Sequence, residues 1–264
     1  MKKTRKIFAL LSLVWSCAAM ALPQAIEQQE WAHFFEGAPA VGTIAVLDAR
    51  NGTEKLWVHA TERAKQRFSP ASTFKVPHSL FALQAKVVKD EFDVIAWDQK
   101  QRGNPAWNQD QDLRSAMRNS TVWVFERFAQ TMGQHQEHQW MQQMGYGNAA
   151  TTGAAPFWVE GDLAISALEQ LEFLQKLYRN ALPFELAHQR LVKDLMVNEA
   201  SGNWILRAKT GWTGSIGWWV GWVEHPNGAV FFAMNIDTPH RMGDVAKRQI
   251  ITRQVLRSMA ALPD

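Results

Sequence analysis

Segments with strand character lie at both ends of this chain, and segments with helical character lie between them. Residues 41–50 and 54–60 are predicted as two strands joined by Asn51-Gly52, a dipeptide typical of tight hairpin turns. Three further strands are predicted near the other end, at 203–210, 216–224 and 229–237. Strands so far apart in sequence most simply pair into one sheet. We therefore expect an α+β fold of the sandwich type, with a central antiparallel sheet flanked by helices and an inserted all-helical lobe.

The middle of the chain has helical spacing. Ser166 and Glu169 form a Ser-x-x-Glu capping box at the start of a helix predicted over 166–180. A long loop of small residues at 145–162 is of a length usually found at functional sites. Further helices are predicted at 112–118, 121–132, 184–197 and 243–259. We expect a single domain over 22–264, a helical lobe over roughly 80–198, and a site in the cleft between lobe and sheet.

The first 21 residues have the composition of a secretory signal peptide. Basic residues come first, residues 7–20 are mostly apolar, and Ala19-Met20-Ala21 has the small-x-small pattern of a cleavage site. We expect cleavage after Ala21 and a periplasmic protein of the Gram-negative type. Cys17, the only cysteine, would leave with this segment; the alternative is a lipoprotein anchor at Cys17, which the bulky Trp15 disfavours.

Removing this segment also changes the charge. The chain has 28 Lys and Arg against 25 Asp and Glu, a net charge of +3, and four of the basic residues lie in residues 1–21, which contain no acid. The remaining 24 basic and 25 acidic residues give −1, so no electrostatic argument favours a nucleic-acid partner. No later apolar run is long enough to span a membrane.

Ser72 and Lys75 stand three residues apart at the predicted start of a helix. Ser69 is the expected N-cap and Pro70 the first helical residue, which places Ser72 in the first turn, where the helix dipole is positive. That position suits a nucleophile whose substrate carbonyl becomes an oxyanion. Lys75 then shares a face with Ser72, and Pro77 predicts a kink nearby. Taken alone, this spacing is weak evidence for a catalytic pair, because the ordinary alternative is a lysine whose charged end reaches solvent.

Two later motifs strengthen the pair. Ser120-Thr121-Val122 falls at a break between two predicted helices, and Lys209-Thr210-Gly211 falls at the end of a predicted strand. A serine–lysine pair, then a serine turn, then Lys-Thr-Gly is the order seen in penicillin-recognising serine enzymes.

On these residues the sequence resembles the class D serine β-lactamases, the oxacillinases. The resemblance covers residues 25–260 and implies the β-lactamase/transpeptidase-like fold. The matching motifs are Ser72-Thr73-Phe74-Lys75, Ser120-Thr121-Val122, Tyr146-Gly147-Asn148, Trp158-Val159-Glu160-Gly161 and Lys209-Thr210-Gly211.

The resemblance implies hydrolysis of the β-lactam amide bond of penicillins and related antibiotics, giving antibiotic resistance. It implies that Lys75 is an N6-carboxylysine, made with CO2 or bicarbonate, which serves as general base for Ser72. Val122 and Trp158 would stabilise this carbamate, Val122 by keeping the site dry and Trp158 through its indole N–H. No other cofactor and no metal is expected.

The remaining site residues handle the substrate. By the same resemblance, Ser120 passes a proton to the departing lactam nitrogen with the help of the positive charge of Lys209. Backbone N–H groups of Ser72 and Trp212 would form the oxyanion hole. The substrate-binding residues implied are Thr210, Gly211, Trp212 and Arg248, with Thr210 and Arg248 on the substrate carboxylate. The expected partners are small β-lactams, and the chain is expected to be a monomer or a homodimer.

Three alternatives stay open. A cell-wall DD-peptidase would acylate on Ser72 and release β-lactams very slowly. An antibiotic sensor would stay acylated, although such domains are normally joined to a membrane-spanning segment. A secreted binding protein would use the thirteen tryptophans as a binding surface. Trp123, where the family often has proline, and the short loop after Gly211 leave the cleft shape and the substrate range open.

Overall fold

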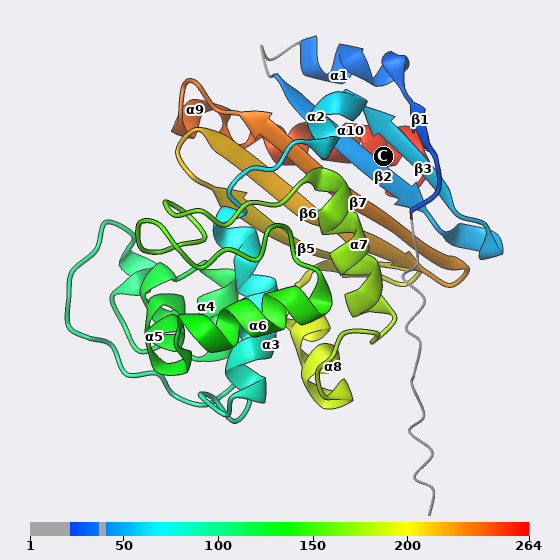
Figure 1. Cartoon of the computed structure of the whole chain (residues 1–264). Coiled ribbons are helices and arrows are strands. Elements are labelled where there is room, and N and C mark those ends of the chain that lie inside the picture. The colour runs from blue at the N-terminus through cyan, green and yellow to red at the C-terminus, as the bar shows by residue number, and fades with distance from the viewer. Residues whose placement is uncertain (1–21, 37–40, 264) are drawn as a thin grey trace, which may run out of the picture.

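The computed structural model describes residues 22–36 and 41–263, so the predicted signal peptide and Cys17 lie outside the described residues. The described residues form a mixed seven-stranded sheet flanked by helices, an α+β fold as expected (Figure 1). The strands are β1 (Ala25–Glu27), β2 (Gly42–Asp48), β3 (Lys55–His59), β4 (Val197–Ser201), β5 (Trp204–Trp212), β6 (Ile216–His225) and β7 (Gly228–Asp237). The helices are α1 (Ala32–Glu36), α2 (Thr61–Lys65), α3 (Lys75–Gln84), α4 (Leu113–Arg118), α5 (Val122–Met132), α6 (Gln134–Met144), α7 (Ala167–Tyr178), α8 (Leu186–Leu195), α9 (Met242–Val245) and α10 (Lys247–Ser258).

The sheet joins the two ends of the sequence. Its strand order is β1-β3-β2-β7-β6-β5-β4, and β2 pairs with β7 so that Ala45 lies opposite Ala233. Neighbouring strands are antiparallel, as predicted, except that β1 runs parallel to β3. The edge strands β1 and β4 have weak sequence signals, because β1 has three residues and β4 is exposed along its length.

Helices cover both faces of the sheet. Helices α1 and α10 pack on one face, and α7 lies across the other (Figure 1). The apolar run of β6 follows from this arrangement, because alternate side chains enter different cores. Trp218 and Trp222 face the helical lobe, whereas Trp219 faces α10. These three tryptophans are fully buried, so they serve as core.

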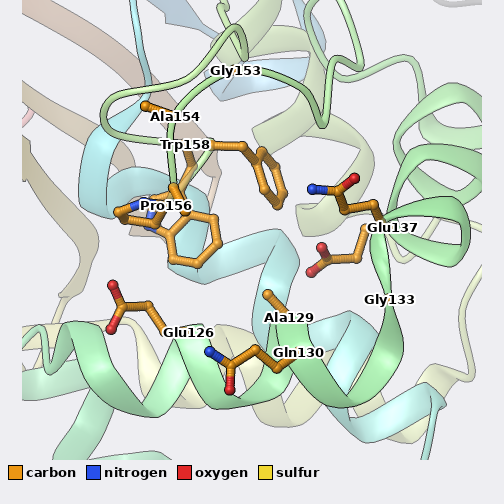
Figure 2. Close-up of a pocket in the computed structure, with 12 residues that line it drawn as sticks. Glu126, Ala129, Gln130, Gly133, Glu137, Gly153, Ala154, Pro156 and Trp158 are labelled. Atoms are coloured by element: carbon orange, nitrogen blue, oxygen red, sulfur yellow. The ribbon is translucent and has the colours of Figure 1, made fainter.

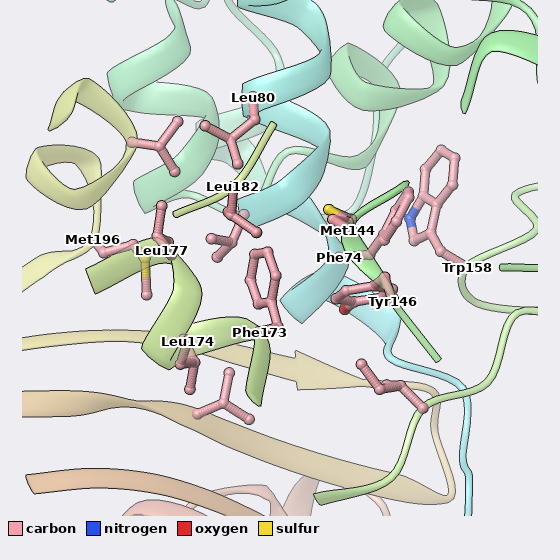
Figure 3. Packing of buried hydrophobic residues seen from close by; sticks show 14 of the residues in the cluster. Phe74, Leu80, Met144, Tyr146, Trp158, Phe173, Leu174, Leu177, Leu182 and Met196 are labelled. Carbon is pink, nitrogen blue, oxygen red and sulfur yellow. The ribbon is translucent and has the colours of Figure 1, made fainter. Parts of the chain in front are cut away.

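Helix α3 runs through the centre of the other core. Figure 3 shows α7 contributing Phe173, Leu174 and Leu177 to the layer between the sheet and α3. The predicted capping box of α7 is confirmed, since Ser166 and Glu169 exchange side-chain and backbone hydrogen bonds. Because α7 packs on β2 and β7, part of the stretch 80–198 covers the sheet, and α4, α5 and α6 make up the lobe beside α3 (Figure 1).

The start of α3 differs from the expectation. Ser69 is not an N-cap: its hydroxyl donates to the carbonyl oxygens of Trp158 (2.8 Å) and Val159 (3.1 Å). A 3-10 turn, Ala71–Phe74, precedes α3 and holds the serine of the Ser-x-x-Lys pair. Pro77 then lies in the first turn of α3, where backbone N–H groups need no helical partner, so the helix is not interrupted. The closing helix is likewise divided, into α9 and α10.

Candidate active site

Three segments meet at the predicted site: the turn before α3, the junction of α4 and α5, and strand β5. Lys75 Nζ donates to Ser72 Oγ at 2.9 Å, which confirms that the two side chains share a face. Lys209 Nζ donates to Ser120 Oγ at 3.0 Å. The structure therefore brings two serine–lysine pairs to one place from residues far apart in sequence.

Lys75 lies in an apolar environment. It has no solvent exposure, and its Nζ stands 5.2 Å from the centre of the Phe125 ring. Burial, and then the charge of Lys209, lower the pKa of Lys75 well below its usual value, against the opposing effect of Glu126. A neutral amine is nucleophilic towards CO2, so this lysine suits carboxylation.

Trp158 offers a hydrogen bond that nothing accepts. The residue is 1% exposed, and its indole N–H has no acceptor among the described residues. A buried donor without a partner is rare and calls for an explanation. Its ring stacks on Phe74, the residue before Lys75, at 5.7 Å between centroids. An anionic group on the lysine would supply the missing acceptor. Val122, which is half-buried, opens α5 on the same side of the lobe.

Ser120 has a strained backbone. Its φ of 55° lies in the left-handed region, which non-glycine residues seldom adopt. It falls between α4 and α5, where the sequence predicts a helix break. Strain of this kind is concentrated at functional sites, because surrounding structure must hold it in place. Here it accompanies the hydrogen bond that Ser120 Oγ accepts from Lys209.

Lys209 is buried in a more polar setting than Lys75. Its Nζ donates to Thr210 O (3.1 Å) as well as to Ser120. Burial, and then the charge of Arg248, lower the pKa of Lys209 to about 7. This amine can therefore gain or lose a proton near neutral pH, beside the Ser120 hydroxyl.

Gly211 lets β5 pass against the turn that carries Ser72. A Cβ at this position would stand 2.7 Å from the carbonyl oxygen of Pro70, closer than real Cβ atoms approach. The Gly211 carbonyl accepts a hydrogen bond of 2.7 Å from Arg248 Nη1. Burial lowers the pKa of Arg248 to about 10, so the guanidinium stays charged at neutral pH and suits a carboxylate. Trp212 follows, with its indole N–H donated to Thr238 Oγ1 at 3.1 Å.

Two aromatic residues singled out in the sequence serve packing. Tyr146 is fully buried against Phe74, and burial raises the pKa of its phenol. Trp123 is 4% exposed and donates its indole N–H to the Trp107 carbonyl at 2.9 Å. Trp123 therefore fills the lobe instead of lining an open cleft.

A buried histidine–glutamate pair next to the site was not predicted from the sequence. His78 Nε2 lies 2.5 Å from Glu137 Oε1, and neither side chain has any solvent exposure. His78 follows Lys75 by one helical turn, so the sequence could have predicted that both lie on the same face of α3. Glu137 lies in α6, and nothing in its local sequence separates it from a solvated helix residue.

Over 22–36 and 41–263, no group of three or more His, Cys, Asp or Glu side chains could hold a metal ion. Within the same ranges no helix is both long enough and apolar enough to cross a membrane.

Comparison with known proteins gives consistent relatives. A family model for the penicillin binding protein transpeptidase domain matches residues 42–257. β-Lactamase OXA-15 of Pseudomonas aeruginosa is 56% identical over 261 residues, which cover 98% of this chain and 95% of that protein. β-Lactamase OXA-2 of Salmonella typhimurium matches with the same identity and coverage.

Solved structures agree with the sequence relatives. The class D β-lactamase YbXI from Nostoc superposes with a TM-score of 0.83 at 39% identity, covering 88% of this chain and 99% of that one. The class D β-lactamase BAT-2 delta mutant superposes with a TM-score of 0.81 at 33% identity, covering 88% and 96%. The likeness therefore extends over nearly the whole chain in both sequence and fold.

Proposed function

The chain belongs to the class D β-lactamases, and on that premise we propose that Ser72 is its nucleophile and a carbamate on Lys75 its general base. Members of this class hydrolyse the β-lactam amide bond through a serine acyl-enzyme, and this chain is such an enzyme. The observation that carries the residue assignment is the fully buried Lys75 amine, 2.9 Å from Ser72 Oγ.

Acylation uses the two serine–lysine pairs in turn. A carbamate oxygen on Lys75 takes the proton of Ser72, whose Oγ attacks the β-lactam carbonyl carbon. Backbone N–H groups of Ser72 and Trp212 stabilise the oxyanion, each such donor contributing about 3 kcal/mol. The C–N bond breaks, and the proton held by the carbamate passes through the Ser120 hydroxyl to the lactam nitrogen, which restores the carbamate anion. The Lys209 ammonium, 3.0 Å away, supports that transfer.

Substrate binding and deacylation complete the cycle. Thr210 and the charged Arg248 hold the substrate carboxylate beside Gly211. The Trp158 N–H donates to the carbamate, and Val122 keeps water from reaching it freely. The same carbamate then takes a proton from water, which attacks the ester carbonyl, and it returns that proton to Ser72 Oγ as the C–O bond breaks.

The test is turnover of a chromogenic cephalosporin by residues 22–264, with and without added bicarbonate. Many turnovers per enzyme, sustained or accelerated by bicarbonate, are expected. One stoichiometric burst followed by no further reaction would contradict hydrolysis. That result would assign the chain to the slow DD-peptidase or the acylated sensor instead.

We propose further that residues 1–21 are removed on export and that the enzyme works in the periplasm as a monomer or homodimer. Amino-terminal sequencing of the protein from a periplasmic fraction should start at Leu22. Lipid-modified protein retained in the membrane fraction would instead favour an anchor at Cys17. Sedimentation of the exported protein gives its oligomeric state.

A further inference from the structure

His78 and Glu137 form a buried polar pair in the middle of an apolar core. Nε2 of His78 lies 2.5 Å from Oε1 of Glu137, and both side chains are fully buried. Withdrawing such groups from water has a large free-energy cost, and apolar side chains of similar volume commonly fill the same place with no loss of stability. Packing alone therefore does not account for this pair.

The pair connects Lys75 to Trp158. His78 lies one helical turn after Lys75 on α3, and its ring meets the Trp158 indole edge-on, with centroids 5.0 Å apart and planes at 68°. On another side the imidazole lies 5.6 Å from Phe125, whose ring also borders Lys75 Nζ. The imidazole thus contacts both the Trp158 indole and the Phe125 ring that borders the lysine.

A cavity lies beside the indole. It has a volume of about 360 Å³ and is bounded by α5, the start of α6 and the loop 153–158 (Figure 2). Trp158 and Glu137 both form part of its wall. Because part of the indole borders this space, close packing does not fix the ring from all sides. The position of the indole then depends on the rings that it does contact, those of Phe74, His78 and Phe157.

We propose that His78 and Glu137 are positioning residues that hold the Trp158 indole where its N–H can donate to the carbamate on Lys75. This inference rests on the proposed function. The Glu137 carboxylate, whose Oε1 lies 2.5 Å from His78 Nε2, sets both the rotation and the tautomer of the imidazole. The imidazole in turn fixes the position of the Trp158 indole. Supporting groups of this kind at metal sites change ligand affinity by about 10-fold to 100-fold.

The first test replaces one carboxylate oxygen of Glu137 with an amide nitrogen. In Glu137→Gln the side chain keeps its size, and an amide replaces the carboxylate that faces His78 Nε2. The bicarbonate concentration for half-carboxylation should rise about tenfold, followed through the 13C carbamate signal in labelled bicarbonate. At saturating bicarbonate, KM for a penicillin should stay within about twofold of wild type. Gln130→Ala, in the same cavity wall and outside the pair, is the control and should carboxylate normally.

The second test separates positioning from stability. The double variant His78→Leu/Glu137→Leu should unfold at or above the wild-type temperature, because an apolar pair can replace a buried ion pair. We expect it nevertheless to bind bicarbonate weakly. Wild-type carboxylation in this variant, or in Glu137→Gln, would overturn the positioning role and leave the proposed function intact. A wild-type enzyme with no carbamate signal would overturn both.

Discussion

Lys75 and Lys209 are both buried, and they occupy opposite kinds of environment. Lys75 Nζ lies over the Phe125 ring and donates to one serine hydroxyl, and in the same core the Trp158 N–H lacks an acceptor. Lys209 donates to a serine hydroxyl and a backbone carbonyl, with Arg248 as its charged neighbour. Burial is the first cause of the lowered pKa of both lysines, yet the two sites differ in which hydrogen-bonding groups have partners. The Lys75 site has an unused donor, whereas the Lys209 site already has its acceptors.

Under the proposed function, this difference accounts for two roles of one residue type. A neutral amine next to an unused N–H gains by becoming an anion, which supplies an acceptor and a base. An amine that already donates to two oxygens gains nothing from carboxylation and serves as a proton donor and a positive charge. Environment sets acid and base roles in the same way for carboxylates.

Removing Lys75 should have the largest effect. We expect Lys75→Ala to slow turnover by about 10⁴-fold, because both steps lose their general base and deacylation nearly stops. Mass spectrometry after mixing with a penicillin should show a persistent acyl-enzyme. Lys65→Ala removes an exposed lysine and should turn over normally. Full turnover by Lys75→Ala would show that Lys75 is not the general base, and the contrast drawn between the two lysines would fail.

Removing the indole N–H of Trp158, which has no acceptor, should have the second-largest effect. Trp158→Phe keeps an aromatic ring and loses the indole N–H, so the carbamate loses its donor. The bicarbonate concentration giving half-maximal rate should rise about 100-fold, with the rate recovered at saturation. Initial rates over a bicarbonate series measure this. Trp204→Phe, on β5 away from the lysine, should leave the series unchanged, and an unchanged series for Trp158→Phe would contradict the proposed role.

The lowered pKa of Lys209 predicts a pH dependence of stability. The unfolded lysine, with a pKa of about 10.4, still holds a proton at pH values where the folded one, at about 7, has lost it. The free energy of unfolding should therefore rise with pH, by about 2 kcal/mol between pH 7 and 9.

Urea unfolding in bicarbonate-free buffer measures that rise. Lys209→Met should lack it, while the contribution of Lys75 remains in both proteins. Parallel pH profiles for wild type and variant would mean that Lys209 is not the titrating group.

Moving β5 should have the smallest of these effects. In Gly211→Ala the new methyl group meets the Pro70 carbonyl, so the strand shifts away from the turn that carries Ser72. We expect kcat/KM to fall about tenfold, since small misplacements of reacting groups slow catalysis strongly. Gly202→Ala meets no atom within 4 Å and is the matched control. Equal activities for the two variants would show that the spacing is not critical.

Much of the site could be predicted from local sequence. The spacing of Ser72 and Lys75 requires only a helical turn, and the structure confirms their contact. Ser120 at a helix break and the capping box of Ser166 and Glu169 depend on neighbours a few residues away, and both are confirmed. The prediction of Ser69 as an N-cap was wrong, which shows the limit of local sequence rules. The Ser69 hydroxyl donates instead to the carbonyl oxygen of Trp158, in a loop far away in the sequence.

The sequence by itself determined the two ends of the sheet, the order of the motifs and the family they indicate. These are properties of short segments, where backbone geometry links residues one to four positions apart. Only the tertiary structure decided that Lys209 reaches Ser120, that Gly211 must lack a side chain beside Pro70, and that Glu137 meets His78. Each of those contacts joins residues on different elements, and its energy depends on burial that exists only after the sheet and the lobe have packed together.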